Sequence, residues 1–183
     1  MTVTPNDREL NDWLQSSYAR AYRTAVMICG NPDDAREAVQ DAFLRTWRFR
    51  ASLPEDSGRE PWLYRVIVNA CYSKMRQEVP RRDRERARID DTLVLPAIDL
   101  SPETAAEQQE LGYLVALAMT ALPESLRVPL VLRYWSGLSE REIALAIQRR
   151  PGTVKSRLHE GRRRLAADPT LVGYAGELLG AAL

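Results

Sequence analysis

The sequence predicts an all-α protein with two small helical domains joined by a flexible acidic linker. Apolar residues recur at steps of three and four along most of the 183 residues, and no segment alternates convincingly between apolar and polar side chains. This periodicity fades between Pro80 and Pro102, where the charge changes from basic to acidic. We therefore expect the domains at 6–78 and 102–168, a linker at 79–101 and an apolar tail at 169–183.

Three helices are expected in the first domain. The first helix should end at Gly30, because glycine readily takes the left-handed conformation that closes a helix. Asn31 is placed to cap the second helix, and Pro32 suits its first position. A loop rich in proline and charge is expected at 53–61, followed by a third helix from about Trp62.

The second domain is expected to begin with a helix from about Ser101 or Pro102 and another that Pro123 opens, which Pro129 should kink or shorten. Two further helices, separated by a tight break, are expected from Leu138 onwards. Ser139 can cap the first of them, and Glu142 can return a hydrogen bond, as in a capping box. The break at 148–150 is followed by Pro151, which suits a first helical position because it lacks the amide hydrogen that would be unpaired there. This layout is typical of a helix-turn-helix DNA reader.

The helix that begins at Pro151 has one apolar face. Val154, Leu158 and Leu165 share this face, which leaves polar and basic residues for the other side and the flanks. Those residues are Thr153, Lys155, Ser156, Arg157 and His159. Such a helix can enter a major groove of DNA. The same pattern also fits a solvated basic helix on an ordinary helical bundle.

Charge is distributed in blocks although the net charge is only +1. Residues 59–88 carry nine basic and four acidic side chains, and residues 138–165 carry eight basic and three acidic ones. Between them, residues 89–110 carry six acidic side chains and no basic one. Two basic blocks indicate two separate contacts with a polyanion, since phosphates are contacted by local lysine and arginine. Solvated surfaces would show the same composition.

Little in the sequence favours catalysis or a cofactor. The single histidine and the two cysteines, Cys29 and Cys71, form no metal-binding pattern, and the cysteines are expected to be buried free thiols. There is no phosphate-binding glycine loop and no nucleophile elbow. We therefore expect no enzyme, no cofactor, no metal and no small-molecule substrate. No apolar run suffices for membrane insertion, and the polar start predicts a cytoplasmic protein.

Three segments together resemble the extracytoplasmic-function sigma factors, the smallest members of the bacterial sigma-70 family. The segments are DDAREAVQDAFLRTWRF at 33–49, PWLYRVIVNACYSKMR at 61–76, and ALPESLRVPLVLRYWSGLSEREIALAI…PGTVKSRLHEGRRRL at 121–165. The resemblance covers nearly the whole chain. It implies a protein that binds core RNA polymerase and directs it to promoters, with sigma region 2 and sigma region 4 as its two domains.

The resemblance also implies functional residues. The second helix resembles the surface that docks on the β′ coiled coil of the polymerase, and the residues implied are Gln40, Asp41, Arg45 and Arg48. Region 2 reads and melts the minus-10 element, which implies Ser57, Arg59, Arg65, Asn69, Tyr72, Lys74 and Arg76. Region 4 contacts the β flap and reads the minus-35 element, which implies Arg149, Arg150, Thr153, Lys155, Ser156, Arg157, His159 and Arg162. An anti-sigma factor is the expected regulator, and the acidic linker is expected in the template and RNA path.

Some points stay open from the residues alone. Arg157 could instead pack its stem on the fold. Ser73 stands where many relatives carry aspartate, and Glu160 stands where relatives often carry a basic residue. Glu160 would weaken DNA binding unless it accepts a hydrogen bond from a cytosine amine or pairs with a neighbouring arginine. Two other functions remain as alternatives: a free-standing helix-turn-helix regulator, which would bind duplex DNA unaided as a dimer, and a helical adaptor without a DNA target.

Overall fold

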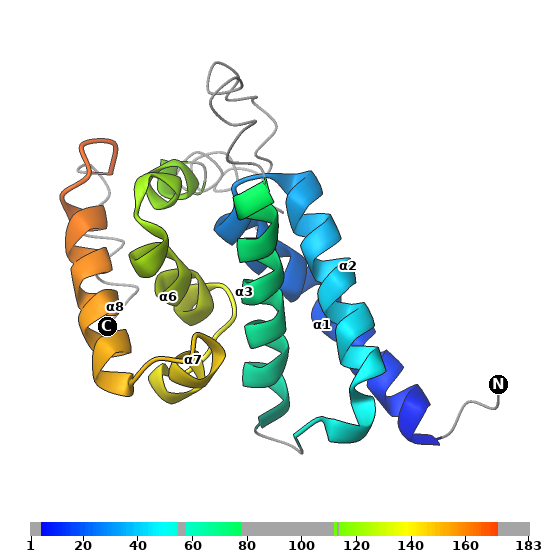
Figure 1. Cartoon of the computed structure of the whole chain (residues 1–183). Helices are drawn as coiled ribbons and strands as arrows, with labels where there is room; N and C mark the ends of the chain where they lie inside the picture. Colours follow the sequence, from blue (N-terminus) through cyan, green and yellow to red (C-terminus); the bar gives the residue numbers. More distant parts are fainter. Residues whose placement is uncertain (1–4, 55–57, 78–111, 113, 172–183) are drawn as a thin grey trace, which may run out of the picture.

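The computed structural model describes residues 5–54, 58–77, 112 and 114–171 (Figure 1). Within these ranges every element is helical, as the sequence predicts. The elements are α1 (Pro5–Cys29), α2 (Pro32–Arg48), the short 3-10 helix η1 (Arg50–Ser52), α3 (Arg59–Gln77), α6 (Glu124–Tyr134), α7 (Glu140–Ala146) and α8 (Pro151–Ala166). Residues 114–121 are also helical. The expected linker and the tail from residue 172 onwards lie outside the described residues.

The boundaries between the first helices follow the predicted signals. Gly30 has a φ of 71°, and its amide donates a hydrogen bond of 2.8 Å to the carbonyl of Val26. The side chain of Asn31 then accepts hydrogen bonds from the amides of Asp33 and Asp34, at 2.8 and 3.1 Å. Two of the amides that a helix start leaves unpaired are thereby satisfied.

The third helix begins earlier than the sequence predicts. Residues 59–61 were expected in a loop because of Pro61, but α3 starts at Arg59. Pro61 lies in the first turn, where a missing amide hydrogen costs no helical hydrogen bond. Helix α3 therefore contains all the basic residues between 59 and 76, which are the first part of the basic block at 59–88.

A face of small residues lets α2 pack closely against its neighbours. Ala35, Ala38, Val39 and Ala42 are completely buried, and α1, α2 and α3 all pack against one another. Cys29 and Cys71 are buried and form no disulfide, as expected. The neighbouring Cys29 thiol and burial together hold the pKa of Cys71 well above its usual range. Because the thiolate is the reactive form of cysteine, we expect Cys71 to be an unreactive side chain of the core.

The helix-turn-helix is built as its sequence predicts. Ser139 and Glu142 form a reciprocal capping box: the Glu142 amide donates a hydrogen bond of 3.3 Å to the Ser139 hydroxyl, and the Ser139 amide donates one of 2.8 Å to the Glu142 carboxylate. Gln148 in the turn has a φ of 52°, and Pro151 is the first residue of α8. Gly161 lets α8 approach α6, because a Cβ there would lie 2.7 Å from a methyl carbon of Leu130.

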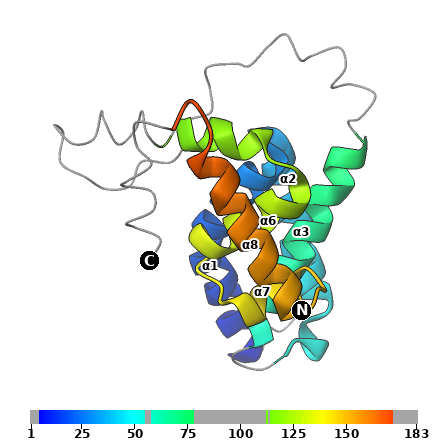
Figure 2. The same cartoon turned by 90° about the vertical axis from the view of Figure 1, so that its left-hand side faces the viewer.

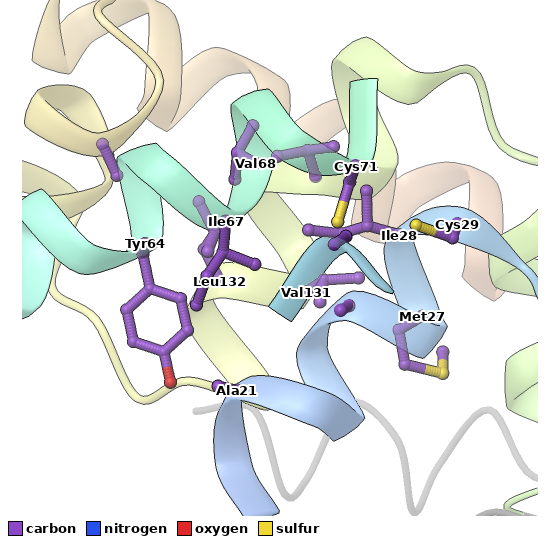
Figure 3. Packing of buried hydrophobic residues seen from close by; sticks show 14 of the residues in the cluster. Ala21, Met27, Ile28, Cys29, Tyr64, Ile67, Val68, Cys71, Val131 and Leu132 are labelled. Carbon is purple, nitrogen blue, oxygen red and sulfur yellow. The ribbon is translucent and has the colours of Figure 1, made fainter. Parts of the chain in front are cut away.

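The two halves of the chain share one hydrophobic core, for which the sequence contains no signal. Figure 3 shows Ile67 of α3 next to Leu132 of α6, and Ala21 of α1 belongs to the same cluster. A buried hydrogen bond of 2.9 Å joins the hydroxyls of Thr24 and Ser136 across this boundary. As a result α3 occupies the middle of the molecule, between α1 and α2 on one side and α7 on the other (Figure 1).

Candidate nucleic-acid interface

The outer side of α8 is a continuous polar surface. Val154, Leu158 and Gly161 are buried against the rest of the fold, and the opposite side faces the viewer in Figure 2. Lys155, Ser156 and His159 are exposed on that side, and Arg149 and Arg150 are exposed in the turn before it. Thr153 and Arg162 are half-buried at the flanks. The division of this helix into an apolar and a polar face agrees with the sequence prediction.

Arg157 differs from the other basic residues of α8. It is half-buried and lines a small cavity of about 80 Å³ between α3 and the helix-turn-helix, together with Asn69, Tyr72, Glu124 and Arg149. Burial raises the pKa of the Tyr72 hydroxyl, and nearby Glu124 raises it further while Arg157 lowers it. Two residues expected at the minus-10 element thus lie across a cavity from two expected at the minus-35 element.

One stripe of α3 gathers most of the residues expected at the minus-10 element. Arg65, Asn69, Tyr72 and Arg76 follow at helical steps of three and four, so they share one side of the helix. The last three of them, with Ser73, line an open hollow of about 410 Å³. This hollow combines an amide, an aromatic ring, a hydroxyl and a guanidinium.

Two other residues expected at the minus-10 element are turned elsewhere. Lys74 forms an ion pair of 2.5 Å with Glu37 of α2, which raises the pKa of Lys74 and lowers that of Glu37. The guanidinium of Arg59 lies 5.5 Å from the ring centre of Trp13 on α1, and 3.6 Å from a carboxylate oxygen of Glu9. The structure therefore does not bring them to the stripe of α3, and Ser57 lies outside the described residues.

The outer side of α2 combines polar residues with an exposed leucine. Gln40, Arg45 and Arg48 are exposed and Asp41 is half-buried. Leu44 lies among them and is 58% exposed, although sequence reasoning did not select it. The sequence could have indicated Leu44, because it is an apolar residue outside the apolar stripe of α2.

Glu160 is tied to two arginines of its own helix. One carboxylate oxygen accepts hydrogen bonds from Nη2 of Arg163 and Nε of Arg164, both 2.8 Å long. The other oxygen accepts one from Nε of Arg163, also at 2.8 Å. These arginines lower the pKa of Glu160 to about 2. Sequence reasoning had left open such pairing with an arginine, but had not selected Arg163.

Comparisons with known proteins identify the family of this chain. The family model described as sigma-70 region 2 matches residues 13–80, and that described as sigma-70, region 4 matches residues 114–165. The ECF RNA polymerase sigma factor SigM of Mycobacterium tuberculosis is 32% identical over 169 residues, which cover 92% of this chain and 80% of SigM. The chain belongs to the extracytoplasmic-function sigma factors of the sigma-70 family. It directs core RNA polymerase to promoters in transcription initiation.

Other relatives agree with this assignment. The sigma-E factor of Escherichia coli is 32% identical over 169 residues, covering 89% of this sigma factor and 88% of that one. SigE of Mycolicibacterium smegmatis is 34% identical over 146 residues, covering 80% of this sigma factor and 56% of SigE. The family assignment decides against a free-standing regulator and against an adaptor without a DNA target.

Solved structures show the same fold. The sigma factor RpoE in complex with the anti-sigma factor NepR from Bartonella quintana superposes with a TM-score of 0.64 at 24% identity, covering 85% of this chain and 95% of RpoE. CnrH in complex with the cytosolic domain of CnrY gives a TM-score of 0.65 at 20% identity, covering 89% of this chain and 88% of CnrH. In the described part of this sigma factor, no helix is long and apolar enough to cross a membrane.

Proposed function

We propose that the stripe of α3 and the outer side of α8 are the two promoter-reading surfaces of this sigma factor. The hollow on α3 supports the first assignment. An unstacked base needs a partner for its edge and a surface for its face, which Asn69 and Tyr72 supply, and Arg76 can neutralise a phosphate. Ser73 lines the same hollow, so we expect it to influence which base is preferred there.

The outer side of α8 is suited to duplex DNA at the minus-35 element. Lys155, Ser156 and His159 carry groups that can bind base edges in a major groove. Arg149, Arg150 and Arg162 flank them and can contact phosphates, which position a recognition helix without reading sequence. Residues 6–78 and 102–168 would then be the two functional units, one for each promoter element.

We further propose that α2 docks on core RNA polymerase through a surface centred on Leu44. An exposed apolar residue within a polar rim is the usual composition of a protein interface. Gln40, Asp41, Arg45 and Arg48 form this rim, and the β′ coiled coil is the expected partner. The second domain would contact the β flap. The protein would act in the cytoplasm with the polymerase and would have no catalysis of its own.

Promoter binding would require α3 and α7 to separate. The cavity between Asn69 and Arg157 is far smaller than a DNA duplex, and the Thr24–Ser136 bond joins the two halves of the chain. The related RpoE and CnrH were each solved in complex with a second protein, NepR or CnrY. By analogy, an anti-sigma factor would hold the closed arrangement, in which α3 packs on α7. Core polymerase would bind the open arrangement, in which these two helices are apart.

Run-off transcription tests the proposed function. Purified core polymerase is incubated with a library of genomic fragments, with and without this protein, and start sites are mapped. Start sites that depend on the protein are expected, and Asn69→Ala and His159→Ala should each reduce their use. Asp41→Arg should prevent co-purification with core polymerase while the helical circular dichroism spectrum is kept. If no start site depends on the protein, the proposal is wrong.

A further inference from the structure

Arg163 extends the exposed line of α8. It lies four residues after His159 and seven after Ser156, so the three side chains are on one side of the helix about one turn apart. Its side chain is 65% exposed. Arg157, which was expected at the minus-35 element, lines the cavity beside α3. The outer side of α8 therefore carries an arginine, Arg163, that is not among the proposed reading residues.

The direction of Arg163 is set by Glu160. Two parallel hydrogen bonds join the guanidinium to both carboxylate oxygens, and such bidentate pairs hold both groups in one plane. The same carboxylate also accepts a bond from Arg164. Three of its roughly four acceptor positions are occupied, so little capacity remains for a cytosine amine. Pairing with arginine is thus the arrangement that the structure favours over base reading.

We propose that Glu160 is a positioning residue of the DNA-reading helix, which holds Arg163 in line with Ser156 and His159 so that Arg163 contacts a DNA phosphate. This inference rests on the proposed function of α8. Arg163 keeps guanidinium hydrogens that Glu160 does not use, because an arginine has five donors and only two are engaged here. A phosphate can therefore bind while the pair with Glu160 is intact.

The same carboxylate lowers the general affinity for DNA. Glu160, Arg163 and Arg164 together carry one positive charge, whereas the two arginines alone would carry two. The salt dependence of binding reports how many phosphates are neutralised. Glu160 would thus weaken the sequence-independent attraction to DNA and at the same time fix the direction of Arg163. Both effects would increase the preference for the correct site over random DNA.

Binding of the reconstituted holoenzyme to two probes tests this proposal. One probe is a promoter fragment found by run-off transcription, and the other is random-sequence duplex DNA. We expect Glu160→Gln to bind random DNA several-fold more tightly and to steepen the slope of log affinity against log salt by about 0.9. Arg163→Gln should flatten the slope on the promoter by a similar amount, and Arg163→Lys should restore it.

Glu140→Gln is the matched control, because it removes the same charge from an exposed carboxylate on α7. Sequence selection from a random pool gives a second measurement, in which Glu160→Gln holoenzyme should prefer the same minus-35 sequence as wild type. A changed preference at one base position with an unchanged slope would show that Glu160 reads a base and would overturn the proposal. Equal effects of Glu160→Gln and Glu140→Gln would overturn it as well. Failure of the wild-type holoenzyme to use any promoter would instead refute the proposed function.

Discussion

The two helices proposed to read the promoter are held in the fold in different ways. Helix α3 packs against α1, α2 and α7, whereas α8 packs against α6 and α7 and leaves its outer side open (Figures 1 and 2). Ile67 and Cys71 of α3 are completely buried, and Tyr72 lines a cavity shared with the helix-turn-helix. The comparison teaches that α8 exposes its proposed reading side in this arrangement, while α3 also maintains the core and, under the proposed function, would become fully accessible only when α7 moves away.

The largest expected effect separates structural from reading residues. Ile67→Ala on α3 should lower the free energy of unfolding by about 2–5 kcal/mol, because it opens a cavity in a fully buried site. His159→Ala on α8 should change it by less than about 0.5 kcal/mol, since the side chain is exposed. Urea denaturation measures both values. A large loss of stability in His159→Ala would show that α8 is as structural as α3.

The hydrogen bond between the two halves should have the next largest effect. Thr24→Val removes one hydroxyl of the buried Thr24–Ser136 pair, which leaves the other without this partner and costs about 1–3 kcal/mol. Because this bond joins α1 to the segment between α6 and α7, its loss should also weaken the packing of α7 on α3. Tyr72 of α3 should then become more exposed. The fluorescence of a thiol probe attached through Ser73→Cys would report the opening.

Ser136→Ala combined with Thr24→Val is the matched control for that measurement. The two hydroxyls also hydrogen-bond to the buried hydroxyl of Tyr64, so the three groups form one network. The double variant removes the Thr24–Ser136 bond from both sides, and any difference between its loss of stability and the sum of the single losses measures the coupling between the two residues. If the single Thr24→Val variant is as stable and as closed as wild type, this bond does not hold the halves together.

A smaller effect is expected at the start of α7, the helix that both reading helices contact. Ser139→Ala should cost about 1 kcal/mol at neutral pH, because it removes a side-chain cap. The hydroxyl and amide of Ser139 lower the pKa of Glu142, so the ionised carboxylate stabilises the folded state above its usual pKa. This contribution is lost as the pH falls through the lowered pKa. In thermal unfolding, the difference between the two proteins should become smaller as the pH is lowered from 7 to 3, and only the part due to the Glu142 amide bond to the Ser139 hydroxyl should remain. A difference that does not change with pH would contradict this account.

The smallest effect distinguishes two basic residues of α3. Lys74 is paired with Glu37, whereas Arg76 lines the hollow of the stripe. Arg76→Gln should therefore reduce open-complex formation several-fold, and Lys74→Gln should reduce it much less. Stability should change little in either case, since an exposed ion pair contributes about 0–1 kcal/mol. Permanganate footprinting of the melted strand measures the difference, and equal losses would show that Lys74 leaves Glu37 to contact DNA.

Local signals predicted the helices and most of their ends. Gly30, Asn31, Ser139 and Pro151 act through atoms within a few residues of themselves, so the sequence near each one is enough to predict its role. The start of α3 was misplaced because Pro61 suits both a loop and a first helical turn. The candidate surfaces were predicted partly by the residues and partly by resemblance to the sigma-70 family.

The sequence by itself determined the all-α fold, the polar side of α8 and the family, because helical periodicity, capping and motif spacing depend on neighbours along the chain. Only the tertiary structure decided that Lys74 turns to Glu37 and that Arg157 faces the cavity beside α3. It also decided the bond between Thr24 and Ser136, which are 112 residues apart. The physical reason is that these contacts depend on how helices dock, and docking is set by the summed packing of many side chains that no local pattern encodes.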